Sequence, residues 1–294
     1  MRYLKEGALA AAVLAGLGVP ARADSTIDPA HPYAYGANVG WINTRADGGG
    51  AAIGPSFCTG RLWSATSGWI GLGHGPGNGL HYGNAATNDW GVNHDGSGRL
   101  SGCAYGANVG WLVFEQSYGK PRVDLVTGVL SGYAWGANVG WVGLSNVQSF
   151  VRTQALDPGP DRDADSLADA YEYAHTNTLT VLSGLGGQDS DGDGVSDRAE
   201  ADADTDPLDR SDYLRIVSLE VAGGTNRVQW IARPTRLYRL ETTNTLSGAP
   251  GAWADSGAGL IGPPEASPAE AVVSGVVQPT RFYRVRALAP LSGP

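Results

Sequence analysis

"SGYAWGANVGWVGL", residues 131–144, is the stretch from which the fold of this chain can be predicted. Its centre, GANVGW, occurs unchanged at residues 36–41, 106–111 and 136–141. A fourth unit, "GRLWSATSGWIGLG", lacks the GAN but keeps the Gly-Trp pair. Aligned on that pair, the four units end at Trp41, Trp69, Trp111 and Trp141. Internal repetition of this length indicates one supersecondary unit used several times.

Each unit is predicted to be a β-hairpin. "LSGYAW" alternates like a strand, and "VGWVGL" is the return strand. The turn between them is GAN, because Gly136 and Asn138 tolerate positive φ at low cost. We expect the repeated Trp and Tyr residues to pack between neighbouring units and form the core. Residues 31–150 are therefore predicted to be an aromatic, glycine-rich β repeat domain.

The alternative is a lectin-like module, in which exposed aromatic rings stack on sugars and repetition adds avidity to weak sites. With Trp41, Trp111 and Trp141 buried, the candidate glycan contacts are Tyr33, Tyr105 and Trp135. The exposure of these rings decides between the two interpretations.

This region resembles short repeats of the type GYAWGENIGW, which occur in many exported bacterial and archaeal proteins. The resemblance implies a secreted, extracellular or cell-surface setting in a bacterium, and it implies no known chemistry. Residues 1–23 agree with export. Arg2 and Lys5 precede the apolar run "GALAAAVLAGLGV", and Ala21-Arg22-Ala23 is a small-x-small cleavage pattern, so we predict a signal peptide. No other stretch is long and apolar enough to span a bilayer.

Residues 157–212 hold most of the acidic residues of the chain, with 16 acidic and 3 basic residues. Within "DSDGDGVSDRAE", acidic residues stand at positions 1, 3, 5, 9 and 12, glycine at position 6, and a carbonyl donor at position 7. These ligands are Asp189, Asp191, Asp193, Val195, Asp197 and Glu200. Alternate carboxylates in a tight loop converge on one point, and this is the pattern that Ca²⁺ requires.

The stretch "DRDADSLADAYE" repeats the pattern 28 residues upstream. Its predicted ligands are Asp161, Asp163, Asp165, Leu167, Asp169 and Glu172. Ser166 replaces the glycine, so we expect this first loop to bind calcium more weakly than the second. A third piece, "DADTDPLDRSD", is expected to lend Asp204 and Asp206 to the neighbouring ions. The paired loops resemble thrombospondin type 3-like calcium repeats. The rival interpretations are a dockerin, which also pairs two calcium loops, and a solvated acidic linker.

Residues 213–290 read as a C-terminal β sandwich of about seven short strands, similar to immunoglobulin or fibronectin domains. Cys58 and Cys103 are the two cysteines of the chain. Export makes a disulfide between them plausible, and two unpaired thiols are the alternative.

The predicted fold is mainly β: a repeat β-hairpin domain, a short calcium-loop and helix connector, and a C-terminal sandwich. No catalytic motif is present among those tested, so we expect no enzyme. The favoured function is a secreted or cell-surface calcium-binding protein with a structural or adhesive role. The alternatives are a carbohydrate-binding protein and a polysaccharide-active enzyme whose site is not recognised. The expected cofactor is Ca²⁺. The expected partners are extracellular polysaccharide or other surface proteins. Nothing in the charge distribution is typical of nucleic-acid binding.

Overall fold

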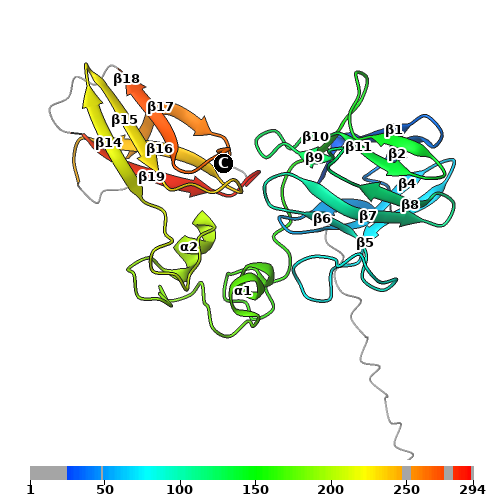
Figure 1. The fold of residues 1–294 in the computed structure, drawn as a ribbon, viewed down its shortest axis with the longest axis horizontal. Coiled ribbons are helices and arrows are strands. Elements are labelled where there is room, and N and C mark those ends of the chain that lie inside the picture. Colours follow the sequence, from blue (N-terminus) through cyan, green and yellow to red (C-terminus); the bar gives the residue numbers. More distant parts are fainter. Residues whose placement is uncertain (1–24, 48, 247–252, 275–280, 293–294) are drawn as a thin grey trace, which may run out of the picture.

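A computed structural model of the chain describes residues 25–47, 49–246, 253–274 and 281–292. The fold is mainly β, as predicted, with two β bodies and two short helices between them (Figure 1). The predicted signal peptide, residues 1–23, lies outside the described residues. A helix of the length and apolarity needed to cross a membrane is not found among the residues described.

The four repeats form a closed antiparallel sheet. Its hairpins pair β1 with β2, β4 with β5, β7 with β8 and β11 with β12, so the hairpin prediction is confirmed. Neighbouring hairpins also pair, and β12 returns to β1 to close the ring. The strand bounds are β1 Ile27–Gly36, β2 Gly40–Asn43, β4 Cys58–Ser64, β5 Gly68–Gly73, β7 Leu100–Gly106, β8 Gly110–Phe114, β11 Tyr133–Gly136 and β12 Gly140–Gly143.

The prediction that the repeated aromatic residues form the core is wrong. In each hairpin a ring on the first strand lies directly opposite the tryptophan of the second, as Tyr35 lies opposite Trp41. These rings are on the outside of the closed sheet, and Trp41, Trp111 and Trp141 are 48%, 43% and 45% exposed. The inward positions carry smaller side chains, namely Ala34, Ile42, Leu62, Ile70, Ala104, Leu112, Ala134 and Val142. A closed sheet of this strand number has an interior just wide enough for such side chains, which explains why the large rings face outward.

The corner of each hairpin also differs from the prediction. The positive φ falls on the second glycine, at Gly40, Gly110 and Gly140, and neither Gly136 nor Asn138 has one. The first glycine has a different role. A Cβ on Gly36 would lie 2.7 Å from Cγ1 of Val39, which turns inward and is 1% exposed. Glycine at this position therefore makes room for the valine that closes the end of the core.

The repeated asparagine joins the four corners in a ring of hydrogen bonds. Nδ2 of Asn38, Asn108 and Asn138 donates to the carbonyls of Val139, Ser67 and Val109, at 3.2, 3.1 and 3.2 Å. In the second unit Thr66 takes this position, and its hydroxyl donates to the carbonyl of Val39 at 2.6 Å. Each unit thus bonds to the one beside it, and the ring closes on itself.

Smaller strands complete the repeat domain. β3 (Gly50–Ile53) and β6 (Val92–His94) add to β4 and β7, and β13 (Val151–Thr153) adds to the first half of β1. β9 (Arg122–Val123) pairs with β10 (Leu130–Ser131). The insertion before β6 packs on the sheet through the buried Tyr82, whose hydroxyl donates to the carbonyl of Cys58 at 3.0 Å.

The predicted disulfide is not present, because both cysteines are free. They lie on opposite faces of the sheet. Cys58 is 1% exposed within the core, whereas Cys103 occupies the outward position that Tyr133 holds in the fourth unit. The Cys103 thiol donates to Oδ1 of Asn84 at 3.0 Å.

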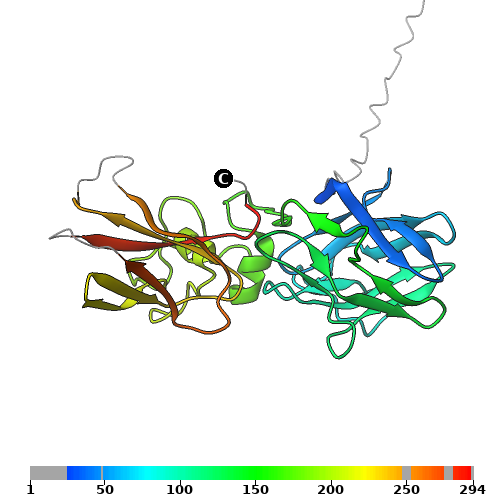
Figure 2. The same cartoon turned by 90° about the horizontal axis from the view of Figure 1, so that it is seen from above.

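The connector contains α1 (Asp169–Thr176) and α2 (Asp197–Ala203). The C-terminal body has two three-stranded antiparallel sheets that share a core around Trp230, Tyr238 and Leu240. Its strands are β14 Ile216–Ala222, β15 Thr225–Trp230, β16 Leu237–Thr243, β17 Ala254–Ile261, β18 Ala269–Ser274 and β19 Phe282–Leu288. Figure 2 shows these sheets from above, beside the repeat domain.

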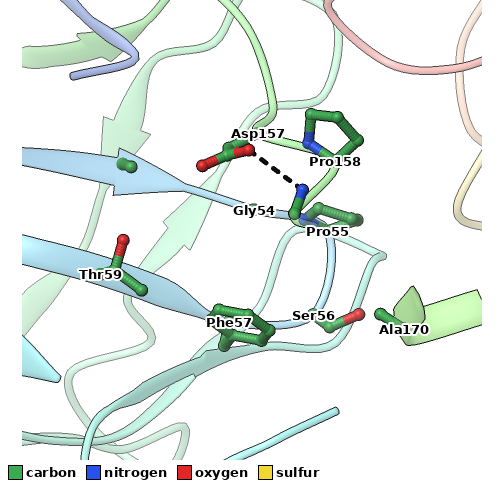
Figure 3. A pocket seen from close by; sticks show the side chains of 10 residues that line it. Gly54, Pro55, Ser56, Phe57, Thr59, Asp157, Pro158 and Ala170 are labelled. Carbon is green, nitrogen blue, oxygen red and sulfur yellow. Dashed lines mark hydrogen bonds between the residues drawn. The ribbon is translucent and has the colours of Figure 1, made fainter. Parts of the chain in front are cut away.

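The connector touches the repeat domain where it begins. A small pocket between the two is lined by the β3–β4 corner, by Asp157 and Pro158, and by Ala170 of α1 (Figure 3). The Asp157 amide donates to the carbonyl of Ile53 at 2.8 Å, and its side chain accepts from the amide of Gly159 at 3.0 Å. Ala170 of α1 thus lies across this pocket from the β3–β4 corner.

Candidate calcium-binding site

The connector brings the acidic residues of each loop together. In loop one, the carboxylates of Asp161, Asp163 and Asp165 offer oxygens that lie within 4.8 Å of one another, and those of Asp189, Asp191 and Asp193 do the same in loop two. Each loop leads directly into a helix, α1 or α2, so its twelfth residue sits in the first helical turn. Hard carboxylate oxygens converging in this way suit Ca²⁺.

The two loops share the same internal hydrogen bonds. In loop two, Oδ1 of Asp189 accepts from the amide of Asp193 at 3.2 Å and Oδ2 accepts from Gly194 at 2.9 Å. In loop one, Asp161 accepts from the amides of Asp165 and Ser166 at 3.2 and 3.0 Å. The first aspartate of each loop thus fixes the fifth and sixth residues.

The ninth residue of each loop also braces it. Asp169 accepts from the amide of Arg162 at 2.8 Å, and Asp197 accepts from that of Ser190 at 2.8 Å. Both aspartates are buried at the start of their helices, where negative charge is favoured by the helix dipole. The predicted ligand positions Asp169 and Asp197 therefore hold the loop closed.

Loop one carries backbone strain that loop two avoids. The fourth and sixth residues have positive φ in both loops, and loop two places Gly192 and Gly194 there. Loop one has Ala164 and Ser166 instead, at φ of 58° and 79°. Side chains rarely adopt this region, and each such residue costs on the order of 1 kcal/mol or more. Ser166 was recognised from the sequence, but Ala164 was not, although alignment with Gly192 would have found it.

The twelfth residue of each loop is a buried carboxylate without a partner. Glu172 and Glu200 are both fully buried, and neither oxygen of either side chain accepts a hydrogen bond in the described structure. Burial, and then the loop aspartates led by Asp163 and Asp191, raise the pKa of Glu172 to about 7 and that of Glu200 to about 8. A buried ionised carboxylate needs a cation or a donor. A divalent ion among the aspartates supplies that partner, so the residues present fit calcium.

The aspartates within one loop respond differently to this crowding. The amides of Gly194, Gly192 and Asp193 lower the pKa of Asp189. Burial and the charges of Asp193 and Asp189 raise the pKa of Asp191. Oδ2 of Asp191, Oδ2 of Asp193 and both carboxylate oxygens of Glu200 are buried without a hydrogen-bond partner. Carboxylate oxygens of this kind are available to coordinate Ca²⁺.

Comparison with known proteins agrees with this geometry. Residues 189–210 match the family model of the bacterial TSP3 repeat. Repeats of this family bind calcium, and the match covers loop two, α2 and most of the third acidic piece. No curated protein and no solved structure matches the chain. The resemblance to thrombospondin type 3-like repeats is thereby confirmed for this segment.

The remaining predicted ligands are the seventh residue of each loop and two aspartates that follow α2. Leu167 and Val195 occupy the seventh position, and their amides donate to Asp165 and Asp193 at 2.8 and 2.7 Å. That their carbonyls bind an ion stays a prediction. Asp204 caps the end of α2 and bonds to Thr235, while Asp206 pairs with His175 at 3.2 Å. That Asp204 and Asp206 coordinate a neighbouring ion likewise stays a prediction.

The connector is tied together internally and to the C-terminal body. The Tyr171 hydroxyl of α1 donates to the carbonyl of Thr205 at 2.9 Å, which links the two loop-helix units. Arg236 of the C-terminal body donates to the last carbonyls of α2, from Nη2 to Ala201 and from Nε to Asp202, both at 2.8 Å. This role of Arg236 was not predictable from the sequence, because its partners are backbone groups.

The candidate glycan contacts are all on the surface. Tyr33, Tyr105 and Trp135 are 42%, 40% and 41% exposed on the outside of the closed sheet. Other rings of the repeats, which were not predicted as glycan contacts, also face outward, namely Tyr35, Trp41, Trp63, Trp69, Trp111, Tyr133 and Trp141. Their alternation with inward Ala, Val, Leu and Ile was the available signal.

Proposed function

We propose that this is an exported calcium-binding protein of bacterial origin with a structural or adhesive role, in which calcium fixes a connector between two β bodies. The observation that carries the proposal is the pair of aspartate triads, each facing a buried and unpartnered glutamate. The match to a calcium-binding repeat supports it. Secretion or surface location is supported by the signal-peptide pattern of residues 1–23.

The net charge of the segment explains why an ion matters. Residues 157–212 carry a net charge of −13, and their buried apolar set is small, chiefly Leu167 and Leu182. Without cations, repulsion among the carboxylates opposes the compact loops. Two bound Ca²⁺ ions offset part of that charge, and coordination ties each loop to its own helix.

Calorimetry and small-angle scattering on the mature chain test the proposal together. Titration with Ca²⁺ should show at least two binding events, and the radius of gyration should rise when a chelator is added. The test variant is Asp191→Asn with Asp193→Asn in loop two. Its matched control is Asp202→Asn, since Asp202 lies on the exposed side of α2. No heat of binding, or the same radius of gyration with and without chelator, would contradict the proposal.

Carbohydrate binding through the repeat domain is the second candidate, and the exposure of the repeated rings favours it. A panel of polysaccharides tests it. That the chain is not an enzyme, and that the C-terminal sheets form an immunoglobulin-like or fibronectin-like sandwich, stay predictions.

A further inference from the structure

Two of the four repeats present the same pair of aromatic residues and are neighbours in space. In the first unit Tyr33 meets Trp41 edge to face, with ring centroids 6.2 Å apart at 74°. In the fourth unit Tyr133 meets Trp141 at 6.1 Å and 74°. The β12–β1 pairing that closes the sheet sets these units side by side. Together they form the outer aromatic face, which consists of Tyr33, Tyr35, Trp41, Tyr133, Trp135 and Trp141.

The other two repeats have lost this arrangement. The position of Tyr133 is taken by Arg61 in the second unit and by Cys103 in the third. The guanidinium of Arg61 lies 5.3 Å from the ring of Trp69. In the third unit, an aromatic ring from the chain's own insertion packs on the repeat. The ring centroid of Trp90 lies 5.4 Å from that of Trp111 and 6.1 Å from that of Tyr105.

The third unit shows which kind of group packs on this surface. Trp90 lies over Gly71, where an added Cβ would be 3.3 Å from its ring. Gly143 is the equivalent of Gly71, since Gly71 pairs with Arg61 and Tyr105 as Gly143 pairs with Tyr133 and Tyr35. Over Gly143 lies the ring of Tyr133 itself, with Cε1 3.3 Å from an added Cβ. The absence of a side chain at Gly143 lets the ring of Tyr133 lie against the sheet. The side chain of Tyr133 remains half-exposed.

The chemistry of the face fits a sugar ring better than an apolar side chain. Its rings offer flat apolar surfaces, while the hydroxyls of the tyrosines and the indole N–H groups lie at their edges. The strand residues opposite Tyr33, Tyr133 and Trp135 are Asn43, Gly143 and Val113, which carry no charge. Residues 31–150 hold five basic and five acidic residues, so the domain as a whole is neutral.

We propose that the outer aromatic face of the first and fourth repeats binds the pyranose rings of a neutral polysaccharide, and that Tyr33 and Tyr133 are its two principal stacking platforms. This rests on the second candidate function and adds where the ligand lies and of which class it is. Two platforms on adjacent units engage one polysaccharide chain at two points, so that weak contacts add. Tyr105, whose ring already packs against Trp90, contributes little.

The chain itself supplies the variant for the test. Tyr33→Arg with Tyr133→Arg copies the residue that the second repeat uses at this position, so the closed sheet should form normally. Tyr118→Arg makes the same change at a residue that is 84% exposed and outside the face. Binding of the mature chain is measured by sedimentation with cellulose and chitin, and by affinity electrophoresis with dextran, xylan and starch. Alginate serves as the charged comparison.

We expect the double variant to lose affinity on the order of tenfold or more, and Tyr118→Arg to bind like the wild type, with or without chelator. Binding that the double variant retains would overturn the placement while leaving carbohydrate binding standing. Binding of alginate alone would overturn the neutral class. Binding of no polysaccharide would defeat both the inference and the second candidate. The same holds if the wild-type chain self-associates through this face and the double variant is monomeric, because the face is then an interface between copies. The calcium proposal is untouched by these outcomes.

Discussion

Nδ2 of Asn138 donates to the carbonyl of Val109, 3.2 Å away, and so bonds the corner of the fourth repeat to that of the third. The equivalent bonds of the other units complete a ring at one end of the closed sheet. This hydrogen bond explains why asparagine recurs at this position. Turn geometry does not explain it, because the φ of Asn138 is not positive.

The first prediction concerns this ring. Asn138→Gly should destabilise the repeat domain by about 1 kcal/mol, because it removes the donor to a backbone carbonyl. Asn138→Thr should restore most of the loss, since Thr66 makes the same bond in the second repeat. Urea unfolding followed by tryptophan fluorescence measures both. Equal stability of Asn138→Gly and the wild type would show that the bond contributes nothing.

The second prediction concerns the strain in loop one. Ala164→Gly with Ser166→Gly should tighten calcium binding at loop one, because both residues have positive φ. Relief on the order of 1 kcal/mol per residue corresponds to about a fivefold gain for each substitution. Gly194→Ala should weaken loop two by a similar factor, although open space surrounds that position. Calorimetry on both variants provides the measurement, and unchanged affinity at loop one would refute the strain argument.

The third prediction concerns pH. Without calcium the pKa of Glu200 is raised to about 8 from an ordinary value of 4.5, so the folded connector favours the protonated form. The contribution of Glu200 to the stability of the calcium-free connector is therefore fully present below pH 4.5 and is lost as pH rises toward 8. Calcium favours the ionised form, so binding at pH 7 should release protons and tighten as pH rises to about 8.

Titrations in buffers of different ionisation enthalpy measure that proton release. Glu200→Gln keeps the side-chain volume, and it should weaken calcium binding and reduce the release, leaving only the part from Glu172, whose pKa is raised to about 7. An observed heat that does not depend on the buffer would count against this assignment.

Whether a feature of this structure could be predicted from the sequence depends on whether that feature is local. The calcium loops were predictable residue by residue, because spacing along one short segment fixes which carboxylates converge. The direction of the repeat aromatics was not, because both faces of strands such as Tyr33-Ala34-Tyr35 are apolar. Only closure of the sheet, which depends on the distant β12–β1 pairing, leaves too little interior room for Trp41 or Trp141. The contacts of Arg236 with the α2 backbone are equally non-local.

The fourth prediction concerns the two thiols. Burial raises the pKa of Cys58 to about 12, and it also raises the pKa of Cys103, which is only partly buried. A thiol reagent should therefore modify one cysteine in the native protein and both after denaturation without reductant. Cys103→Ser should abolish the native reaction, and Cys58→Ser should leave it intact. Finding no free thiol in the denatured, unreduced protein would restore the disulfide.

The last prediction separates calcium binding from the positioning of the C-terminal body. Arg236 donates to the carbonyls of Ala201 and Asp202 at the end of α2, and its side chain is mostly buried between the two parts. Arg236→Gln should leave those carbonyls without their charged donor, while the aspartate triads stay unaltered. Calcium affinity should then stay within about twofold of the wild type, because the partners of Arg236 on α2 are backbone carbonyls and none of the triad aspartates. Scattering of the calcium-loaded variant should nevertheless show a larger radius of gyration, as the C-terminal body loses its fixed orientation on α2. Arg239→Gln is the matched control, since Arg239 is half-exposed on β16 and pairs with Asp255 at 3.8 Å. If Arg236→Gln scatters like the wild type, α2 is held to the C-terminal body by other contacts; if it loses calcium as well, binding and positioning are one event.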